Sequence, residues 1–352
     1  AAVEFNICSH QQLVDVAQTK LAIPTAGVKK GKTGYSTAAA ELDKLRENHP
    51  IIDFISQYRE VTKLKSTYVD TLPTMVDEQS RLHTTFNLTI AQTGRLSSTD
   101  PNLQNIPVRT DLGKKIRTAF VAGPGNVLIS ADYSQFELRL AAYLCGDEDL
   151  IDMFNRDVDV HVATAAEVYN REPQDGSKNM RREAKVVNFG VMYGLSVHGL
   201  VQATGMSYDQ ATHFIKRYFE VRPKLQGYID TIKNQAKEKG YVETIFGRRR
   251  PTPDVHSSNF AVREAAYRAA VNVPFQGSAA DIMKLAMVRL QEKLDGTDCE
   301  LLLQIHDSVI AECPEKDAEK YATLIKQTME DVHKLTVKLT VDTSTGKTWG
   351  EL

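Results

Sequence analysis

Two short apolar segments, far apart in the chain, each end near an aspartate. The segment 128–131 leads into Asp132, and the segment 303–305 leads through His306 into Asp307. Both segments are typical of buried strands. A carboxylate at such a position is costly unless it is neutralised, and two carboxylates repel unless cations lie between them. We therefore expect a fold that brings the two strand ends together around hard divalent cations such as Mg²⁺, the arrangement of two-metal phosphoryl transfer.

The size and composition exclude several classes of protein. A chain of 352 residues with 42% hydrophobic residues can bury a large core, and we expect two or three lobes. No segment reaches the roughly 18 apolar residues of a membrane span, and the N-terminus shows no signal-peptide pattern. The net charge is −2, so a polyanionic partner must be bound by local basic patches. Four cysteines without Cys-x-x-Cys spacing are expected to be free thiols in a reducing cytosol: Cys8, Cys145, Cys299 and Cys313.

Periodicity and turn residues predict helices and strands along the chain. Residues 1–75 are expected to be helical and polar, with a helix capped near Ser36 and another over 50–65. The Lys- and Gly-rich segment 27–34 resembles a phosphate loop but is one residue short, which favours a mobile loop. The further expected elements are short strands and turns over 81–131, helices over 137–144 and 147–240, a strand entering a turn over 240–247, helices over 261–294 interrupted at Pro274 and Gly277, and a hairpin over 301–312.

A second group of residues lies on one predicted helix. Arg181, Lys185, Phe189 and Tyr193 follow one another in steps of four and form one stripe, beside Arg182. The cations suit a triphosphate, and the rings offer a stacking surface for a base and sugar. An ordinary amphipathic helix with a solvated basic edge fits the same pattern equally well. Gly190 and Gly194 in this helix indicate close approach by a ligand, or bending.

A third group is rich in turn residues. Arg95 lies within 93–98, and an amide-rich stretch over 100–105 follows. Such groups bind nucleic-acid backbone and minor-groove acceptors, although a plain surface loop is the simpler interpretation. Arg268, Asn272 and Gln276 step by four along another predicted helix, and a basic turn covers 247–250. That turn suits either phosphate contact or a solvated charge run.

Taken together, these segments closely resemble family A DNA polymerases, the bacterial DNA polymerase I group. The segments 132–139, 181–194 and 304–307 look like its first catalytic motif, its nucleotide-binding helix and its last catalytic motif, and 93–107 and 272–277 also match in order. The likeness runs from about Phe5 to Glu351. It implies an α+β fold with right-hand polymerase architecture: an antiparallel-sheet palm (76–139 and 278–352), helical fingers (140–277) and part of a helical thumb (1–75).

The resemblance also implies an activity. A template-directed DNA polymerase would let a primer 3′-hydroxyl attack the α-phosphorus of a deoxynucleoside triphosphate and release pyrophosphate. Asp132, Asp307 and the backbone carbonyl of Tyr133 would hold two Mg²⁺ ions, for which Mn²⁺ can substitute. Lys185 would be a catalytic residue that donates a proton to the leaving pyrophosphate. The implied partners are primer–template DNA and the nucleotide, and we expect a cytoplasmic monomer without membrane contact, associated with the nucleoid if the source is bacterial.

The resemblance assigns two sets of contact residues. Glu137 would crowd the sugar 2′ position and exclude ribonucleotides, and Phe189, where some relatives carry tyrosine, would discriminate against dideoxynucleotides. The nucleotide set is Arg181, Arg182, Lys185, Phe189, Tyr193, Glu137, Gln135 and His161. The DNA set is Arg95, Asn102, Gln104, Asn105, Arg268, Asn272, Gln276 and His306.

Two departures from the family pattern leave alternatives open. Ser308 follows Asp307 where family A DNA polymerases usually carry glutamate, and His-Asp-Ser is similar to the single-subunit RNA polymerases. The chain also begins inside the expected thumb, without the first palm strand or a proofreading domain. An RNA polymerase or an RNA-template-tolerant polymerase is therefore one alternative, and a non-catalytic fragment that binds primer–template is another.

Overall fold

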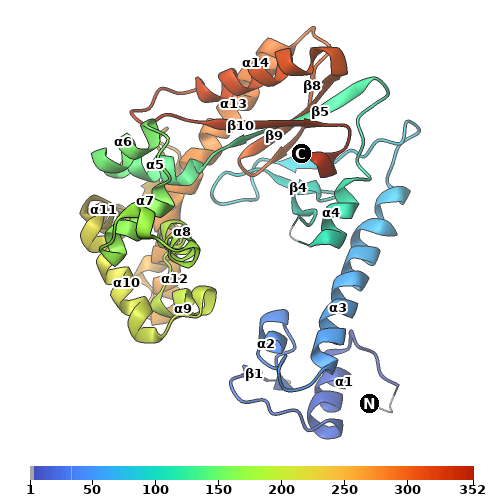
Figure 1. Ribbon diagram of the computed structural model, residues 1–352, viewed down its shortest axis with the longest axis vertical. Helices are drawn as coiled ribbons and strands as arrows, with labels where there is room; N and C mark the ends of the chain where they lie inside the picture. Colours follow the sequence, from blue (N-terminus) through green and yellow to red (C-terminus); the bar gives the residue numbers. More distant parts are fainter. Residues whose placement is uncertain (1–3, 33, 109) are drawn as a thin grey trace. The chain divides into compact units, whose positions relative to one another are not determined.

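The computed structural model describes residues 4–32, 34–108 and 110–352. The chain folds into two compact units, Ala1–Thr84 with Pro107–Ile116, and Thr85–Ile106 with Arg117–Leu352 (Figure 1). Within the described ranges, no helix is both long enough and apolar enough to span a bilayer. The four cysteines are free thiols, as expected.

The first unit is small and mainly helical. Its core gathers buried apolar side chains such as Leu13, Leu42 and Ile52. Its elements are α1 (His10–Asp15), η1 (Val16–Lys20), β1 (Lys30–Gly31), β2 (Gly34–Tyr35), α2 (Ala39–Asp43), α3 (Ile51–Leu64), η2 (Lys65–Val69), η3 (Leu72–Thr74) and most of α4 (Asp111–Arg117).

Two expectations for this unit need correction. Ala38, and not Ser36, is the N-cap residue of α2; the Ser36 hydroxyl instead accepts a hydrogen bond from the Ala38 backbone N–H at 3.3 Å. The Lys- and Gly-rich segment, expected to be a mobile loop, contains the short strand β1, in which Lys30 pairs with Tyr35 in an antiparallel ladder. Thr33, within that segment, lies outside the described residues.

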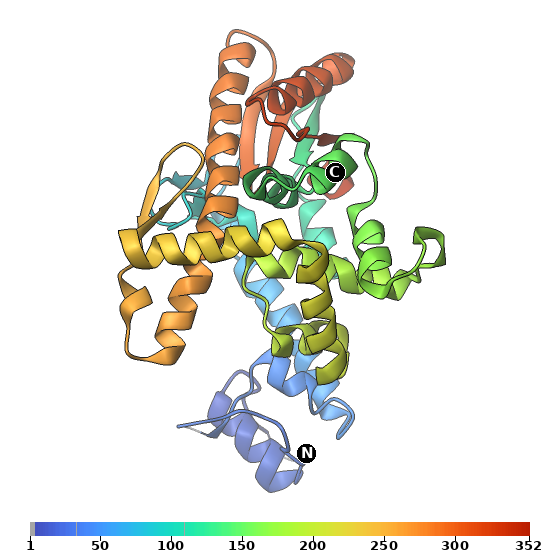
Figure 2. The same ribbon diagram turned by 90° about the vertical axis from the view of Figure 1, so that its left-hand side faces the viewer.

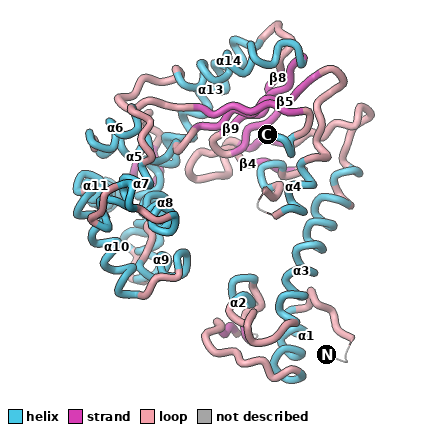
Figure 3. The backbone as a smooth tube through the Cα atoms, in the orientation of Figure 1, coloured by secondary structure: helices cyan, strands magenta, loops and turns pink. Residues whose placement is uncertain are grey.

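A four-stranded antiparallel sheet in the order β10-β5-β9-β8 is the centre of the second unit (Figure 3). Alternating apolar residues of β5 face a core that Ile129, Ile282 and Ile325 share, and helices α13 and α14 cover this face (Figure 2). The elements are β5 (Asn126–Tyr133), α13 (Ser278–Leu294), β8 (Glu300–Ile305), β9 (Ser308–Pro314), η8 (Glu315–Asp317), α14 (Ala318–Glu330), β10 (Val341–Gly346) and η9 (Trp349–Glu351).

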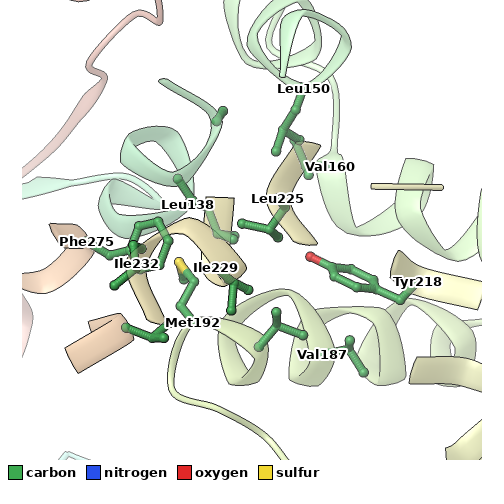
Figure 4. Close-up of a cluster of buried hydrophobic side chains, with 14 of the residues drawn as sticks. Leu138, Leu150, Val160, Val187, Met192, Tyr218, Leu225, Ile229, Ile232 and Phe275 are labelled. Atoms are coloured by element: carbon green, nitrogen blue, oxygen red, sulfur yellow. The ribbon is translucent and has the colours of Figure 1, made fainter. Parts of the chain in front are cut away.

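The chain between β5 and α13 is a helical subdomain with its own apolar core. Leu138, Val187, Met192 and Phe275 meet there, contributed by α5, α8 and η7 (Figure 4). The helices are α5 (Phe136–Cys145), α6 (Glu148–Asn155), α7 (Val160–Tyr169), η5 (Pro173–Asp175), α8 (Lys178–Met192), α9 (Val197–Thr204), α10 (Tyr208–Val221), α11 (Pro223–Lys239), η6 (Pro253–His256), α12 (Phe260–Asn272) and η7 (Val273–Gly277), with the hairpin β6 (Tyr241–Glu243) and β7 (Arg249–Pro251).

The predicted elements of this unit are largely present. The hairpin over 301–312 forms as β8 and β9, and short strands β3 (Thr85–Asn87) and β4 (Ser97–Thr99) precede the turn η4 (Leu103–Asn105). The predicted interruption at Pro274 and Gly277 is the wide π-helical turn η7, so α12 continues into α13 without leaving helical geometry. Polar N-caps begin many of the helices, among them Asp159 for α7 and Ser177 for α8.

Candidate active site

The sheet brings the two predicted aspartates together. Asp132 lies at the end of β5 and is paired in register with Ser308, the residue after Asp307. The Tyr133 backbone N–H donates to the Asp307 carbonyl oxygen at 3.1 Å. Two residues separated by 175 positions in the sequence, as their numbers show, therefore lie at one edge of one sheet. The principal spatial prediction from the sequence is confirmed.

The site concentrates negative charge. Burial, together with repulsion from Asp307 and Asp342, raises the pKa of Asp132 to about 6. Asp342 was not predicted; it lies on β10 directly opposite Asp132 in the ladder. Its sequence signal was the one used for the other two aspartates, an apolar strand segment (339–341) ending in a carboxylate.

The donor set fits divalent metal ions by its chemistry. Carboxylate oxygens next to a backbone carbonyl are hard ligands, and cations between Asp132 and Asp307 would remove the repulsion that raises the Asp132 pKa. In the described part of the chain, His, Cys, Asp and Glu side chains do not gather in threes around a potential metal position.

Arg95 joins the aspartate site to the helical subdomain. Its Nη2 donates to Glu137 Oε1 at 2.6 Å and to Asp307 Oδ1 at 3.2 Å. Glu137, which lies on α5 and is 4% exposed, also accepts hydrogen bonds from the Tyr193 hydroxyl and the Gln276 side chain. Burial raises the pKa of Glu137, and its hydrogen bond from Tyr193 and the charge of Arg95 oppose that shift. Side chains from three separate segments thus donate hydrogen bonds to one carboxylate.

The stripe on α8 begins beside α7. Arg181 forms an ion pair with Asp159 at 2.8 Å, and Lys185 is exposed one turn further along. Phe189 packs against the ring of His161, with 5.6 Å between ring centroids. The pKa of His161 is lowered to about 4, mainly by burial and also by the charges of Arg181 and Lys185, while Asp159 opposes the shift. Tyr193 ends the stripe at the C-cap of α8 and connects it to Glu137.

Not every predicted contact residue faces this stripe. Arg182 donates to Asn179 Oδ1 at 2.9 Å and to the Thr204 carbonyl at 3.3 Å, away from Asp159 and His161. Gln135 caps α5 in a left-handed conformation, and its Oε1 is buried without a hydrogen-bond partner among the described residues.

Gly190 in α8 and Gly194, just after its C-cap, serve packing within the chain. A Cβ at Gly190 would lie 2.7 Å from the Leu195 side chain. Gly194 has φ +70°, and a Cβ there would lie 2.5 Å from Cγ of Arg268. The atoms that come close to both positions belong to the chain itself, and the approach of a ligand stays a prediction.

The amide-rich stretch supports the hairpin that carries Asp307. Asn102 accepts from the Gln104 backbone N–H at 3.0 Å and so caps η4, which also contains Asn105. The Gln104 side chain donates to the Gln304 carbonyl at 3.0 Å, and Gln304 donates to the carbonyl of His306 at 2.5 Å. These contacts hold the tip of the hairpin.

His306 has an uncommon backbone at that tip, with φ 54°. Such a conformation in a residue other than glycine is a sign of a constrained functional turn. Burial lowers the pKa of His306, and the nearby Arg95 lowers it further. The Ser308 hydroxyl donates to the Ile305 carbonyl at 2.9 Å, closing the same turn.

Other predicted DNA contacts have partners within the chain. Asn272 donates to Gln276 Oε1 at 3.1 Å, which aligns that side chain beside Glu137. Within the basic turn, Arg248 is tied to Asp281 at 2.8 Å and to the Thr93 carbonyl at 2.7 Å. Arg248 therefore anchors the segment 93–98 to α13, a structural role that the sequence pattern did not reveal.

Comparison with known proteins identifies the class. Residues 1–351 match the model of DNA polymerase family A, and the chain belongs to this family. The predicted α+β polymerase architecture is confirmed by the POL domain of Pol1 from M. smegmatis, solved in complex with DNA primer-template and dNTP. That structure matches with a TM-score of 0.92 and 41% identity, over 99% of this chain and 62% of that chain.

Two relatives are longer than the part of them that this chain matches. It is 50% identical to the thermostable DNA polymerase I of Thermus thermophilus over 347 residues, which is 98% of this chain and 42% of that protein. It is 46% identical to DNA polymerase I of Lactococcus lactis subsp. lactis (strain IL1403) over 354 residues, 100% of this chain and 40% of that protein. The chain thus spans less than half the length of these relatives.

Proposed function

We propose that this chain is a template-directed DNA polymerase that extends a primer 3′-hydroxyl with deoxynucleoside triphosphates and releases pyrophosphate. The observation that carries the proposal is the convergence of Asp132 and Asp307 at one sheet edge, next to Glu137. Family membership supports it, as does the likeness to a domain that was solved with primer-template and dNTP. In this assignment, 1–75 form part of the thumb, 76–139 and 278–352 the palm, and 140–277 the fingers.

Divalent metal ions are the expected cofactors, and we assign them as a pair of Mg²⁺ ions, replaceable by Mn²⁺. Asp132, Asp307 and the Tyr133 carbonyl would hold them. When bound, such ions supply Lewis-acid activation of the attacking oxygen and neutralisation of charge on the leaving group. The hydrogen bond from Gln104 to the Gln304 carbonyl holds the hairpin that carries Asp307.

The α8 stripe binds the nucleotide in this proposal. Arg181 and Lys185 attract the triphosphate, with His161 beside them, and Lys185 donates a proton to the leaving pyrophosphate. Phe189 and Tyr193 supply the stacking surface. Arg182 and Gln135 complete the set of nucleotide contacts. Arg182 lies at its margin, since it donates hydrogen bonds to Asn179 and to the Thr204 carbonyl.

Glu137 discriminates between sugars in this proposal. It is buried and held by the Tyr193 hydroxyl and by Arg95, so it cannot move away from a 2′-hydroxyl at low cost. The immobilised Glu137 side chain therefore excludes ribonucleotides through an unfavourable contact with the 2′-hydroxyl.

Primer–template DNA lies against a second set of side chains. Arg95, Arg268, Asn272, Gln276 and His306 contact DNA near the new base pair. Asn102, Gln104 and Asn105 act at the edge of this surface, where Gln104 also supports the hairpin. We place the protein with its DNA in the cytoplasm, at the nucleoid of a bacterial cell, and expect a monomer.

Primer extension by the purified chain tests the proposal. We expect Mg²⁺-dependent extension with deoxynucleotides on a DNA template, and loss of at least roughly a thousandfold in kcat for Asp132→Asn, because the carboxylate provides charge that an amide lacks. Glu172→Gln, an exposed change at the N-cap of η5, is the matched control and retains activity. Primer–template binding without extension refutes the proposal in favour of a binding fragment.

The same assay separates the RNA-related alternative. Ser308 is the feature that favours it, although its hydroxyl is engaged with the Ile305 carbonyl. Extension is compared with ribonucleotides and deoxynucleotides, on RNA and DNA templates. Preference for ribonucleotides would replace the proposed activity with RNA synthesis.

A further inference from the structure

Three buried polar side chains form a connected group inside the helical subdomain. His161 and Thr164 lie on α7, and Asn188 lies on the facing side of α8; they are 4%, 0% and 3% exposed. Their neighbours in the chain, such as Val160 and Val187, belong to the apolar core. Polar groups in such surroundings cost free energy unless they hydrogen bond to one another, so their presence calls for an explanation beyond packing.

The hydrogen bonds of this group define the state of the imidazole. Asn188 Nδ2 lies 3.0 Å from Nδ1 of His161 and donates to Thr164 Oγ1 at 3.3 Å, while Thr164 Oγ1 lies 3.4 Å from Asn188 Oδ1. An amide nitrogen carries hydrogens and accepts none, so Nδ1 of His161 must be the acceptor. A neutral imidazole whose Nδ1 accepts carries its hydrogen on Nε2.

The charges around His161 keep the ring neutral. The pKa is lowered to about 4 by burial first; the facing carboxylate of Asp159 opposes the shift, and the cations Arg181 and Lys185 strengthen it. The ring is further held against Phe189. A neutral N–H donor adds a hydrogen bond beside two cations without adding a third positive charge.

We propose that Asn188 is a positioning residue for nucleotide binding: through its hydrogen bond to Nδ1 it fixes His161 as the Nε2–H tautomer, which donates to the triphosphate beside Arg181 and Lys185. This inference rests on the proposed function for its substrate. Thr164 orients the Asn188 amide, and the amide in turn orients the His161 ring. These hydrogen bonds therefore link the core to the nucleotide site.

The tautomer is tested directly by ¹⁵N NMR of the histidine ring in the nucleotide-free protein, with His161 assigned from the signals lost in His161→Gln. We expect a protonated Nε2 and a bare Nδ1 at neutral pH. In Asn188→Asp the carboxylate accepts only, so the proton is expected on Nδ1. A wild-type ring with its proton on Nδ1, or an unchanged ring in Asn188→Asp, overturns the inference.

The role of Asn188 in nucleotide binding is tested by steady-state primer extension. Asn188→Asp should raise the KM for the deoxynucleotide roughly tenfold, the value of one hydrogen bond to a charged group, with a smaller change in kcat. In the His161→Ala background the same substitution should have no further effect, because its action passes through the imidazole. An equal rise in KM in both backgrounds means that Asn188 acts through the fold alone, and overturns the inference.

A further variant and the separate NMR measurement distinguish failure of this inference from failure of the proposed function. Thr164→Val preserves side-chain volume and removes the hydroxyl that orients the amide. It should therefore raise the KM for the deoxynucleotide, as Asn188→Asp does. It serves as the test if the Asn188 variant folds poorly. Failure of the wild-type chain to extend primers refutes the proposed function. The tautomer of the His161 ring is measured separately by NMR and does not depend on the result of the extension assay.

Discussion

Replacing Asp132 with asparagine should make the metal-free protein more stable while it abolishes the proposed activity. The pKa of Asp132 is raised from 3.8 to about 6, so in the folded state its charged form is disfavoured. The full shift of about two pKa units corresponds to roughly 3 kcal/mol. Because Asp132 keeps part of its surface in contact with solvent, screening reduces this figure, and we expect roughly 1 kcal/mol.

The sign of the pH dependence follows from the raised value. Between about pH 4 and about pH 6 the folded state retains a proton that the unfolded state has already lost, so the stability of the wild-type protein falls as pH rises through this window. Above about pH 6 the penalty is complete and constant. Asparagine does not titrate, so the advantage of Asp132→Asn should be absent near pH 4 and full near pH 8.

Thermal and urea denaturation in the presence of EDTA measure this difference. A gain of roughly 1 kcal/mol corresponds to a rise of about 2 °C in melting temperature for a unit of this size. Asp342→Asn should give a smaller gain of the same sign because it removes one neighbour of Asp132, and Glu172→Gln should give none. Added Mg²⁺ should stabilise the wild-type protein more than Asp132→Asn. An asparagine variant that is equally or less stable near pH 8, or whose advantage does not change with pH, refutes the reasoning.

Three further predictions concern the nucleotide site and its packing. Glu137→Ala should raise ribonucleotide incorporation, measured as the ratio of kcat/KM for the two sugars; an unchanged ratio contradicts the assignment. Phe189→Tyr should relieve discrimination against dideoxynucleotides, measured by chain termination, and equal termination by both proteins rejects that role. Gly194→Ala should cost about 2 kcal/mol of unfolding free energy through its left-handed backbone and its clash with Arg268. Gly205→Ala, also left-handed at φ +77° but with open space, should cost less; equal costs would rule out the clash.

Local sequence patterns predicted much of this fold correctly. An apolar segment that ends in an aspartate marked β5, and another marked the β8–β9 hairpin, because alternation and turn residues act over a few positions. Steps of four placed Arg181, Lys185 and Phe189 on one helix face for the same reason. A strand-like segment also precedes Asp342, but that strand was not singled out and Asp342 was not predicted.

Other features depend on contacts between distant segments. Arg248 resembled a phosphate contact in the sequence, yet it is tied to Asp281 and Thr93. Gln104 resembled a DNA contact, yet its side chain reaches Gln304 across about 200 positions. A residue's local neighbours say nothing about partners that far along the chain, so these roles could not be predicted from spacing.

The sequence alone determined the chemistry that is available: two strand-end carboxylates, a cationic and aromatic helix face, and glycines where side chains cannot fit. These depend on residue type and short-range periodicity, both of which are written into the order of amino acids. Only the tertiary structure decided which groups meet. The sheet order put Asp342 beside Asp132, and the packing of α7 on α8 joined Asn188 to His161, because burial and charge act between whichever atoms the fold makes neighbours.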